Sequence, residues 1–208
     1  RLVFELGVFM NLPNKLTVLR LVLVPVFFIA FSLRSIGSNV AVIISTLLMT
    51  ICYMTAELSD LLDGKIARKN NLVTDLGKVL DPFADTLSHL TFFVCFLSYG
   101  IMPAWAFVII MWREFAILFL RMIIIKQGGK AMPANIFGKS KTVLYAFTTL
   151  VSIIFIFAET FIGSGSWNHV GSIVIYVLFA LSAIASITSF FIYLKDVLKS
   201  GILSTMTR

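Results

Sequence analysis

Long apolar runs recur along the whole chain and limit what it can fold into. Residues 38–54 and 101–112 form two of these runs, and neither contains an acidic or basic side chain. Hydrophobic residues make up 59% of the 208 residues and charged residues 13%, whereas charge reaches about a quarter in ordinary soluble domains. Apolar stretches that repeat in this way indicate membrane-spanning helices. We therefore predict an all-α integral membrane protein.

Charged and turn-forming residues divide the apolar sequence into six predicted transmembrane helices. These are expected at residues 19–33, 40–62, 75–99, 104–125, 141–161 and 169–194. Residues 11–17 mix leucine with asparagine and lysine, which predicts an interfacial amphipathic helix that turns into the first span. Residues 1–9 precede the natural-looking start at Met10 and are expected to be a cloning remnant or a misassigned start. A single membrane domain is assigned to residues 10–208.

Basic residues are unevenly distributed between the two sides of the predicted membrane domain. One side has the basic loops near residues 15, 65–69, 126–130 and 139 and the basic C-terminal tail, whereas the other has Arg34 and Glu159. The positive-inside rule places the basic side, with both termini, in the cytoplasm of a cell (inner) membrane. The net charge of +7 is attributed to this asymmetry and to anionic lipid head groups, so no nucleic-acid partner is predicted.

Four aspartates at helical spacing lie where the second predicted span ends and the third begins. Asp60 and Asp63 are three residues apart, and Asp81 and Asp85 are four apart, so each pair occupies one helix face. Carboxylates at membrane depth repel one another and are costly to bury unless cations neutralise them. The set therefore predicts a divalent metal site for one or two Mg²⁺ or Mn²⁺ ions. Asp85, the last of the four, is the candidate general base.

The sequence from Asp60 to Asp85 has the pattern D-x2-D-G-x2-A-R-x8-G-x3-D-x3-D. At every fixed position, this pattern resembles the signature of the CDP-alcohol phosphotransferase family. The resemblance implies a homodimeric membrane enzyme that transfers a phosphatidyl group from CDP-diacylglycerol to an alcohol and releases CMP. It implies metal binding by all four aspartates and base catalysis by Asp85. It also implies that CDP-diacylglycerol is bound by Gly64, Arg68, Thr74, Asn14, Thr17 and Arg20, although Thr74 equally suits the N-cap of the third span.

A second set of basic residues bears on which alcohol accepts the phosphatidyl group. Arg113 and Arg121 lie in the fourth predicted span, and Lys139 and Lys141 lie at the start of the fifth. Arginines inside an apolar span are costly and suggest an anionic partner. Their arrangement, R-E…R…G-K-x-K-T, resembles members of the family that use sn-glycerol 3-phosphate. That resemblance implies that these four cations bind the acceptor's phosphate.

The same basic residues also have structural interpretations. Lys139 and Lys141 are alternatively membrane anchors on the positive side of the protein. Arg121 is alternatively paired with Glu114 or Glu57, and Arg113 with the adjacent carboxylates.

Two further alternatives concern the reaction itself. Thr86 and Glu57 depart from the pattern of the glycerol 3-phosphate subgroup, which leaves inositol phosphate, serine or choline as alternative acceptors. A divalent-cation transporter is the alternative of another class, because intramembrane aspartates often mark ion paths. Fixed positive charges such as Arg68 oppose that alternative, since a cation path avoids them.

Overall fold

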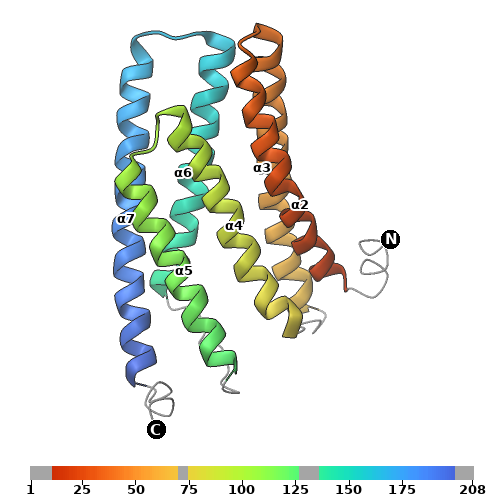
Figure 1. Cartoon of the computed structure of the whole chain (residues 1–208), viewed down its shortest axis with the longest axis vertical. Coiled ribbons are helices and arrows are strands. Elements are labelled where there is room, and N and C mark those ends of the chain that lie inside the picture. The colour runs from red at the N-terminus through yellow and green to blue at the C-terminus, as the bar shows by residue number, and fades with distance from the viewer. Residues whose placement is uncertain (1–10, 70–74, 127–135, 200–208) are drawn as a thin grey trace. The chain divides into compact units, whose positions relative to one another are not determined.

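The computed structural model describes residues 11–69, 75–126 and 136–199, which are almost entirely helical (Figure 1). The helices are α2 (Leu12–Ser32), η1 (Leu33–Ile36, a short 3-10 helix), α3 (Asn39–Lys69), α4 (Asp75–Tyr99), α5 (Ala104–Lys126), α6 (Ile136–Ile162) and α7 (Ser166–Lys199). The described ranges contain no β-strand. The all-α prediction is confirmed.

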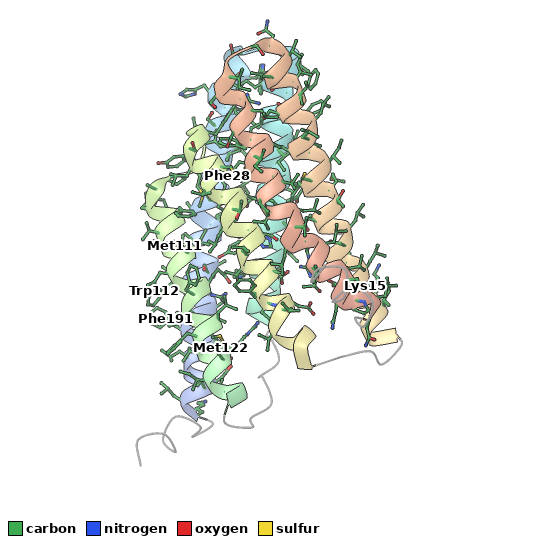
Figure 2. The ribbon with its side chains drawn as sticks, turned by 45° about the vertical axis from the view of Figure 1, so that its right-hand side comes forward. Lys15, Phe28, Met111, Trp112, Met122 and Phe191 are labelled. Carbon is green, nitrogen blue, oxygen red and sulfur yellow. The ribbon has the colours of Figure 1, made fainter. Side chains whose placement is uncertain are left out.

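Four of these helices are long and apolar enough to cross a membrane by length and composition. They include the segments Leu12–Ile36, Asn39–Ile66, Ser140–Ile162 and Ser166–Lys199. Helices α4 and α5 have 25 and 23 residues but carry ionisable side chains near their middle, among them Asp85 and Arg113. Large apolar side chains such as Phe28, Trp112 and Phe191 are exposed and project outward, as lipid-facing residues do (Figure 2). The integral membrane class is confirmed, and membrane crossing by α4 and α5 stays a prediction.

The predicted interfacial segment and the first span form one continuous helix, α2. Asn11 precedes α2 in an extended conformation, and Pro13 occupies its first turn, where a missing N–H costs no helical hydrogen bond. Asn14, Thr17 and Arg20, which the family resemblance assigns to the nucleotide, are all buried. They recur every three residues and therefore lie along one side of α2 that faces protein.

The second predicted span continues further than expected. Helix α3 extends to Lys69, whereas the predicted span ends at residue 62. Asp60 and Asp63 therefore lie within a helix with at least one further turn after them.

The contacts within the chain divide it into two compact units. Unit 1 comprises Arg1–Cys95 and Ile153–Ser164, and unit 2 comprises Phe96–Ser152 and Gly165–Arg208. In unit 1, α2 packs against α3, and the ring of Phe92 on α4 contacts the rings of Phe27 on α2 and Tyr53 on α3. These aromatic contacts fix three helices around the segment that carries the aspartates.

In unit 2, α5 packs against α7. Ile117 and Ile124 of α5 form a buried cluster with Phe190, Tyr193 and Val197 of α7. Each set recurs at three, four or seven residues, so each forms one apolar stripe along its helix.

Short connections follow two of the helices. Gly37 ends η1 with a left-handed φ of 77°, and the Ser38 hydroxyl accepts the N–H of Ala41 at 3.1 Å, which caps the start of α3. Gly100 has a φ of 90° directly after α4, and α5 begins four residues later. These bounds agree with the predicted spans, which end at residue 99 and begin again at residue 104.

Candidate functional site

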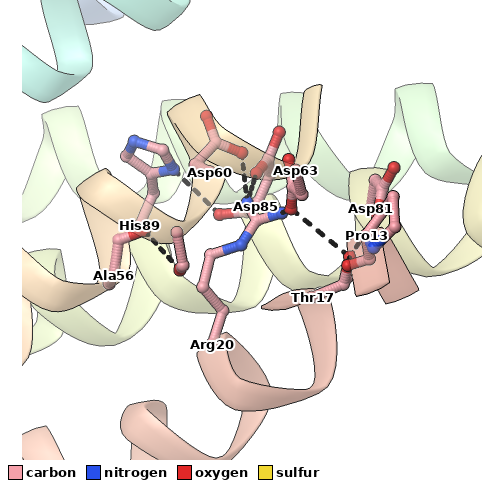
Figure 3. A network of polar contacts seen from close by, with 10 residues as sticks. Pro13, Thr17, Arg20, Ala56, Asp60, Asp63, Asp81, Asp85 and His89 are labelled. Atoms are coloured by element: carbon pink, nitrogen blue, oxygen red, sulfur yellow. Dashed lines mark hydrogen bonds and ion pairs between the residues drawn. The ribbon is translucent and has the colours of Figure 1, made fainter. Parts of the chain in front are cut away.

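Three helices of unit 1 bring the predicted aspartates together (Figure 3). Asp60 and Asp63 lie on successive parts of one face of α3, and Asp81 and Asp85 lie one turn apart on α4. Pro82 lies between the latter two without ending α4. The side of α2 that carries Arg20 faces both pairs, so the site is built from residues far apart in the sequence.

The guanidinium of Arg20 contacts three of the four carboxylates. Its Nη1 donates to Oδ1 of both Asp60 and Asp85, and its Nη2 donates to Oδ2 of Asp63 at 2.6 Å. The Arg20 side chain is only 3% exposed, whereas the side chains of Asp60 and Asp85 are each 41% exposed. An arginine predicted to bind the nucleotide therefore lies within the carboxylate set.

The fourth aspartate is held by Thr17. The hydroxyl of Thr17 donates to Oδ1 of Asp81 at 2.6 Å. The Thr17 hydroxyl oxygen also lies 3.4 Å from Oδ2 of Asp63. Asn14 is buried one turn before Thr17. The three residues predicted for the N-terminal nucleotide contact, Asn14, Thr17 and Arg20, thus share the side of α2 that faces the aspartates.

The carboxylate set fits a hard divalent cation in donor type and in charge. Carboxylate oxygens are the ligands that Mg²⁺ and Mn²⁺ prefer. Among the described side chains, the one guanidinium in contact with the aspartates cannot balance four carboxylates. Oxygens of Asp60 and Asp85, from two different helices, contact a single nitrogen of Arg20, so one cation already bridges α3 and α4. As the side chains lie, no three acidic, histidine or cysteine residues of the described ranges are grouped closely enough to hold a metal ion. We attribute this to the guanidinium, which lies between the carboxylates.

His89 and Glu57 extend the site by one turn on each helix. Nδ1 of His89 lies 2.8 Å from the backbone carbonyl oxygen of Asp85, and the ring packs against Phe93. Glu57 precedes Asp60 by three residues on α3 and is partly buried. This contact with the backbone of α4 indicates a structural role for His89. Its four-residue spacing from Asp85 was the available signal for this contact.

Unit 2 contains a buried ionic cluster centred on Glu114. Oε1 of Glu114 accepts hydrogen bonds from Nη1 of Arg113 at 3.0 Å and from the ammonium of Lys141, and it lies 3.2 Å from the Tyr145 hydroxyl. Nη2 of Arg113 donates to the Ser189 hydroxyl at 2.6 Å. The Lys141 ammonium also lies 4.6 Å from the centre of the Tyr145 ring. Two of the predicted acceptor-binding cations therefore share one carboxylate, which agrees with the alternative interpretation of Arg113.

Hydroxyl groups extend this cluster along α6 and α7, and sequence reasoning missed them. The Tyr145 hydroxyl lies 2.9 Å from Oγ of Ser186, and the hydroxyls of Thr148 and Ser182 lie 3.2 Å apart. Two features of the sequence could have revealed them. Tyr145 follows Lys141 by four residues, and serines recur in α7 at positions 182, 186 and 189.

Arg121 lies two turns after Glu114 on α5. Within the ranges that the structure describes, its buried Nε has no hydrogen-bond partner. The side chains of Arg68 and Lys139 and the whole of Thr74 lie outside the described residues. Their predicted roles stay predictions.

Known proteins resemble the chain over most of its length. A family model described as CDP-alcohol phosphatidyltransferase matches residues 10–188. The chain is 36% identical over 138 residues to a CDP-diacylglycerol–glycerol-3-phosphate 3-phosphatidyltransferase of Bacillus subtilis (strain 168), which covers 64% of this chain and 70% of the relative. It is 31% identical over 193 residues to a protein of the same name from Treponema pallidum (strain Nichols), covering 89% and 88%. It is also 29% identical over 180 residues to a cardiolipin synthase (CMP-forming) of Streptomyces coelicolor, covering 81% and 82%.

Proposed function

Because the chain belongs to the CDP-alcohol phosphatidyltransferase family, we propose that it transfers a phosphatidyl group from CDP-diacylglycerol to sn-glycerol 3-phosphate and releases CMP. The observation that carries this choice of acceptor is the similarity to relatives named for that reaction, one of which covers 89% of the chain. Family membership also leaves the cation-transporter alternative without support.

The charges of unit 2 support an anionic acceptor. Arg113 and Lys141 share the single carboxylate of Glu114, and Arg121 adds a third cation on α5. Positive charge in excess is costly inside an apolar protein and is stabilised by an anion such as a phosphate. We assign acceptor binding to Arg113, Arg121 and Lys141, together with Lys139 from the sequence pattern.

The carboxylates of unit 1 would hold the metal ions. Asp60, Asp63, Asp81 and Asp85 offer oxygen ligands for two Mg²⁺ or Mn²⁺ ions, and such ions, when bound, supply positive charge against the substrate's pyrophosphate and the departing CMP. Gly64 follows Asp63 directly, and its lack of a side chain permits close approach of a phosphate. Arg68 and Thr74, with the polar side of α2, are assigned to CDP-diacylglycerol on the family pattern.

Asp85 is proposed as the general base. Its side chain is 41% exposed, whereas that of Asp63 is 6% exposed, so Asp85 is accessible to an acceptor hydroxyl. The hydroxyl oxygen forms a bond to the β-phosphorus of CDP-diacylglycerol, and its proton passes to the Asp85 carboxylate. The bond between that phosphorus and the oxygen bridging to CMP breaks, so CMP leaves with the electron pair.

The position of the protein in the cell follows from the charge asymmetry of the sequence. We assign it to the cytoplasmic membrane with the aspartate site facing the cytoplasm, because the basic loops are predicted on that side. A homodimer is proposed on the family resemblance.

An acceptor panel tests the proposal. Purified protein receives CDP-diacylglycerol and Mg²⁺ or Mn²⁺ with glycerol 3-phosphate, phosphatidylglycerol, inositol phosphate, serine or choline, and CMP release is measured with the lipid product. We expect turnover with glycerol 3-phosphate alone and loss of turnover when a chelator removes the metal. Cardiolipin as the product would instead support the likeness to the Streptomyces coelicolor relative. Full turnover in excess chelator would refute the metal dependence.

A further inference from the structure

Arg20 is placed as a cation of the carboxylate site. It makes three ion pairs with aspartates of α3 and α4, and Figure 3 shows its guanidinium pointing into that group. The arginine is buried, whereas Asp60 and Asp85 keep 41% of their side-chain surface exposed. The guanidinium therefore holds the carboxylates from the protein side, and their exposed side stays accessible to an ion.

A divalent ion and the Arg20 guanidinium would compete for the same oxygen atoms. Oδ1 of Asp60 and Oδ1 of Asp85 both contact Nη1, and a metal ion held by those oxygens would stand next to a fixed positive charge. Like charges a few ångströms apart repel strongly away from bulk water. The divalent ion and the guanidinium therefore cannot both bind these two oxygens tightly.

The Arg20 side chain also has a reason to leave its position. Its Nε is buried and has no hydrogen-bond partner in the described part of the chain. A buried N–H without a partner carries a desolvation cost that no contact offsets. A phosphate could accept from Nε and a terminal nitrogen together, which is the paired arrangement that arginine favours with phosphates.

We propose that Arg20 is an exchangeable counter-cation. It neutralises Asp60, Asp63 and Asp85 until a divalent ion displaces it, and the released guanidinium then pairs with a phosphate of the nucleotide substrate. This inference rests on the proposed metal dependence. It makes metal binding and nucleotide binding mutually favourable, because the ion that takes the carboxylates also frees a phosphate ligand.

Replacement of Arg20 tests the exchange through metal affinity and protein stability. Mn²⁺ affinity of the purified protein is measured by electron paramagnetic resonance, and the unfolding temperature is measured with and without Mn²⁺. In Arg20→Gln we expect a lower unfolding temperature without Mn²⁺, because three carboxylates lose their cation. We also expect Mn²⁺ to bind about tenfold more tightly or better, because its competitor is gone. The temperature rise on adding Mn²⁺ should be larger than in the wild type.

Arg20→Lys provides a second variant in case Arg20→Gln does not fold. A lysine keeps the charge but not the fork of donors that reaches three carboxylates, so an intermediate gain in Mn²⁺ affinity is expected. Arg34→Gln is the matched control, because Arg34 is in the same unit and donates to the hydroxyls of Thr46 and Thr160. It should leave Mn²⁺ affinity unchanged.

The nucleotide half of the proposal has its own measurement. At saturating Mn²⁺, CDP should bind about tenfold more weakly to Arg20→Gln than to the wild type. Tighter metal binding with weaker nucleotide binding in one variant is a result that a merely structural role would not produce. Unchanged CDP affinity would overturn the transfer of Arg20 to the phosphate.

The possible failures are distinguishable. A wild type that binds no Mn²⁺ would overturn the proposed metal dependence together with this inference. If the wild type binds Mn²⁺ and the Arg20 variants bind it equally well or more weakly, only the exchange is overturned. In that case Arg20 would be a positioning residue for the carboxylates.

Discussion

Replacing Glu114 by glutamine would remove the carboxylate at the centre of the unit 2 cluster while keeping its size. Oε1 of Glu114 accepts from Arg113 at 3.0 Å and from the Lys141 ammonium, and it lies 3.2 Å from the Tyr145 hydroxyl. Glu114, Arg113 and Lys141 are all buried. The substitution therefore leaves two buried cations beside a neutral amide.

The expected loss follows from the two ion pairs. Removing one partner from a buried pair costs about 3–5 kcal/mol, because the remaining charge has no compensation. Since Arg113 and Lys141 both depend on Glu114, we expect the free energy of unfolding to fall by at least about 3 kcal/mol. In a chain of 208 residues, each kcal/mol lowers the unfolding temperature by about 2–4 °C, so a drop of roughly 6–12 °C is expected.

Thermal unfolding of the purified protein in detergent, followed by circular dichroism, measures this loss. Asp196→Asn is the control, because Asp196 is an exposed acidic residue in the same unit and should cost less than about 1 kcal/mol. Lys141→Met, combined with Glu114→Gln, removes one of the two cations that contact Glu114, so the double variant should lose less than the sum of the two single variants. A Glu114→Gln variant as stable as the control, or strictly additive losses, would refute the reasoning.

Three further substitutions test other parts of the molecule. Asp85→Asn should abolish CMP release and leave the unfolding temperature close to that of the wild type; retained turnover would exclude Asp85 as the base. Arg121→Gln should raise the KM for glycerol 3-phosphate about tenfold and leave the KM for CDP-diacylglycerol unchanged, and an equal rise in both would count against acceptor binding. Thr17→Val removes the bond to the Asp81 carboxylate and should lower the free energy of unfolding by about 1.5–3 kcal/mol. Thr55→Val, whose hydroxyl bonds only to the α3 backbone among its described contacts, is its control and should cost less.

The positions of the helices were largely predictable because apolar runs, turns and charges mark them in the sequence. Helix α4 ends at Tyr99 and α5 begins at Ala104, at the bounds that the sequence predicted. The end of α3 was placed too early, at residue 62, because the charged residues that follow suggested a loop. Alanine, lysine and arginine favour helices, so a span can continue as a helix beyond its apolar part.

The sequence predicted which aspartates form the site, but it did not predict the contacts between them and Arg20. Spacing along one helix fixes which side chains share a face, so Asp60 with Asp63 and Asp81 with Asp85 could be paired from the sequence. Arg20 precedes Asp60 by 40 residues, and the packing of α2 on α3 decides that they meet. No local pattern contains that information. Burial of a polar stripe on an otherwise apolar helix was the available signal, because intramembrane polar residues usually face protein.

Among the described side chains, the two ionic clusters are unbalanced in opposite directions, and this imbalance favours a binding site over a purely structural network. In unit 1, among the described side chains, Arg20 contacts three aspartates and Thr17 holds the fourth. In unit 2, Arg113 and Lys141 share the single carboxylate of Glu114. A network that only stabilised a fold would gain most from equal charges, since each buried charge without compensation costs several kcal/mol. Excess negative charge favours a divalent cation and excess positive charge favours a phosphate, which are the two kinds of ligand that the proposed reaction requires.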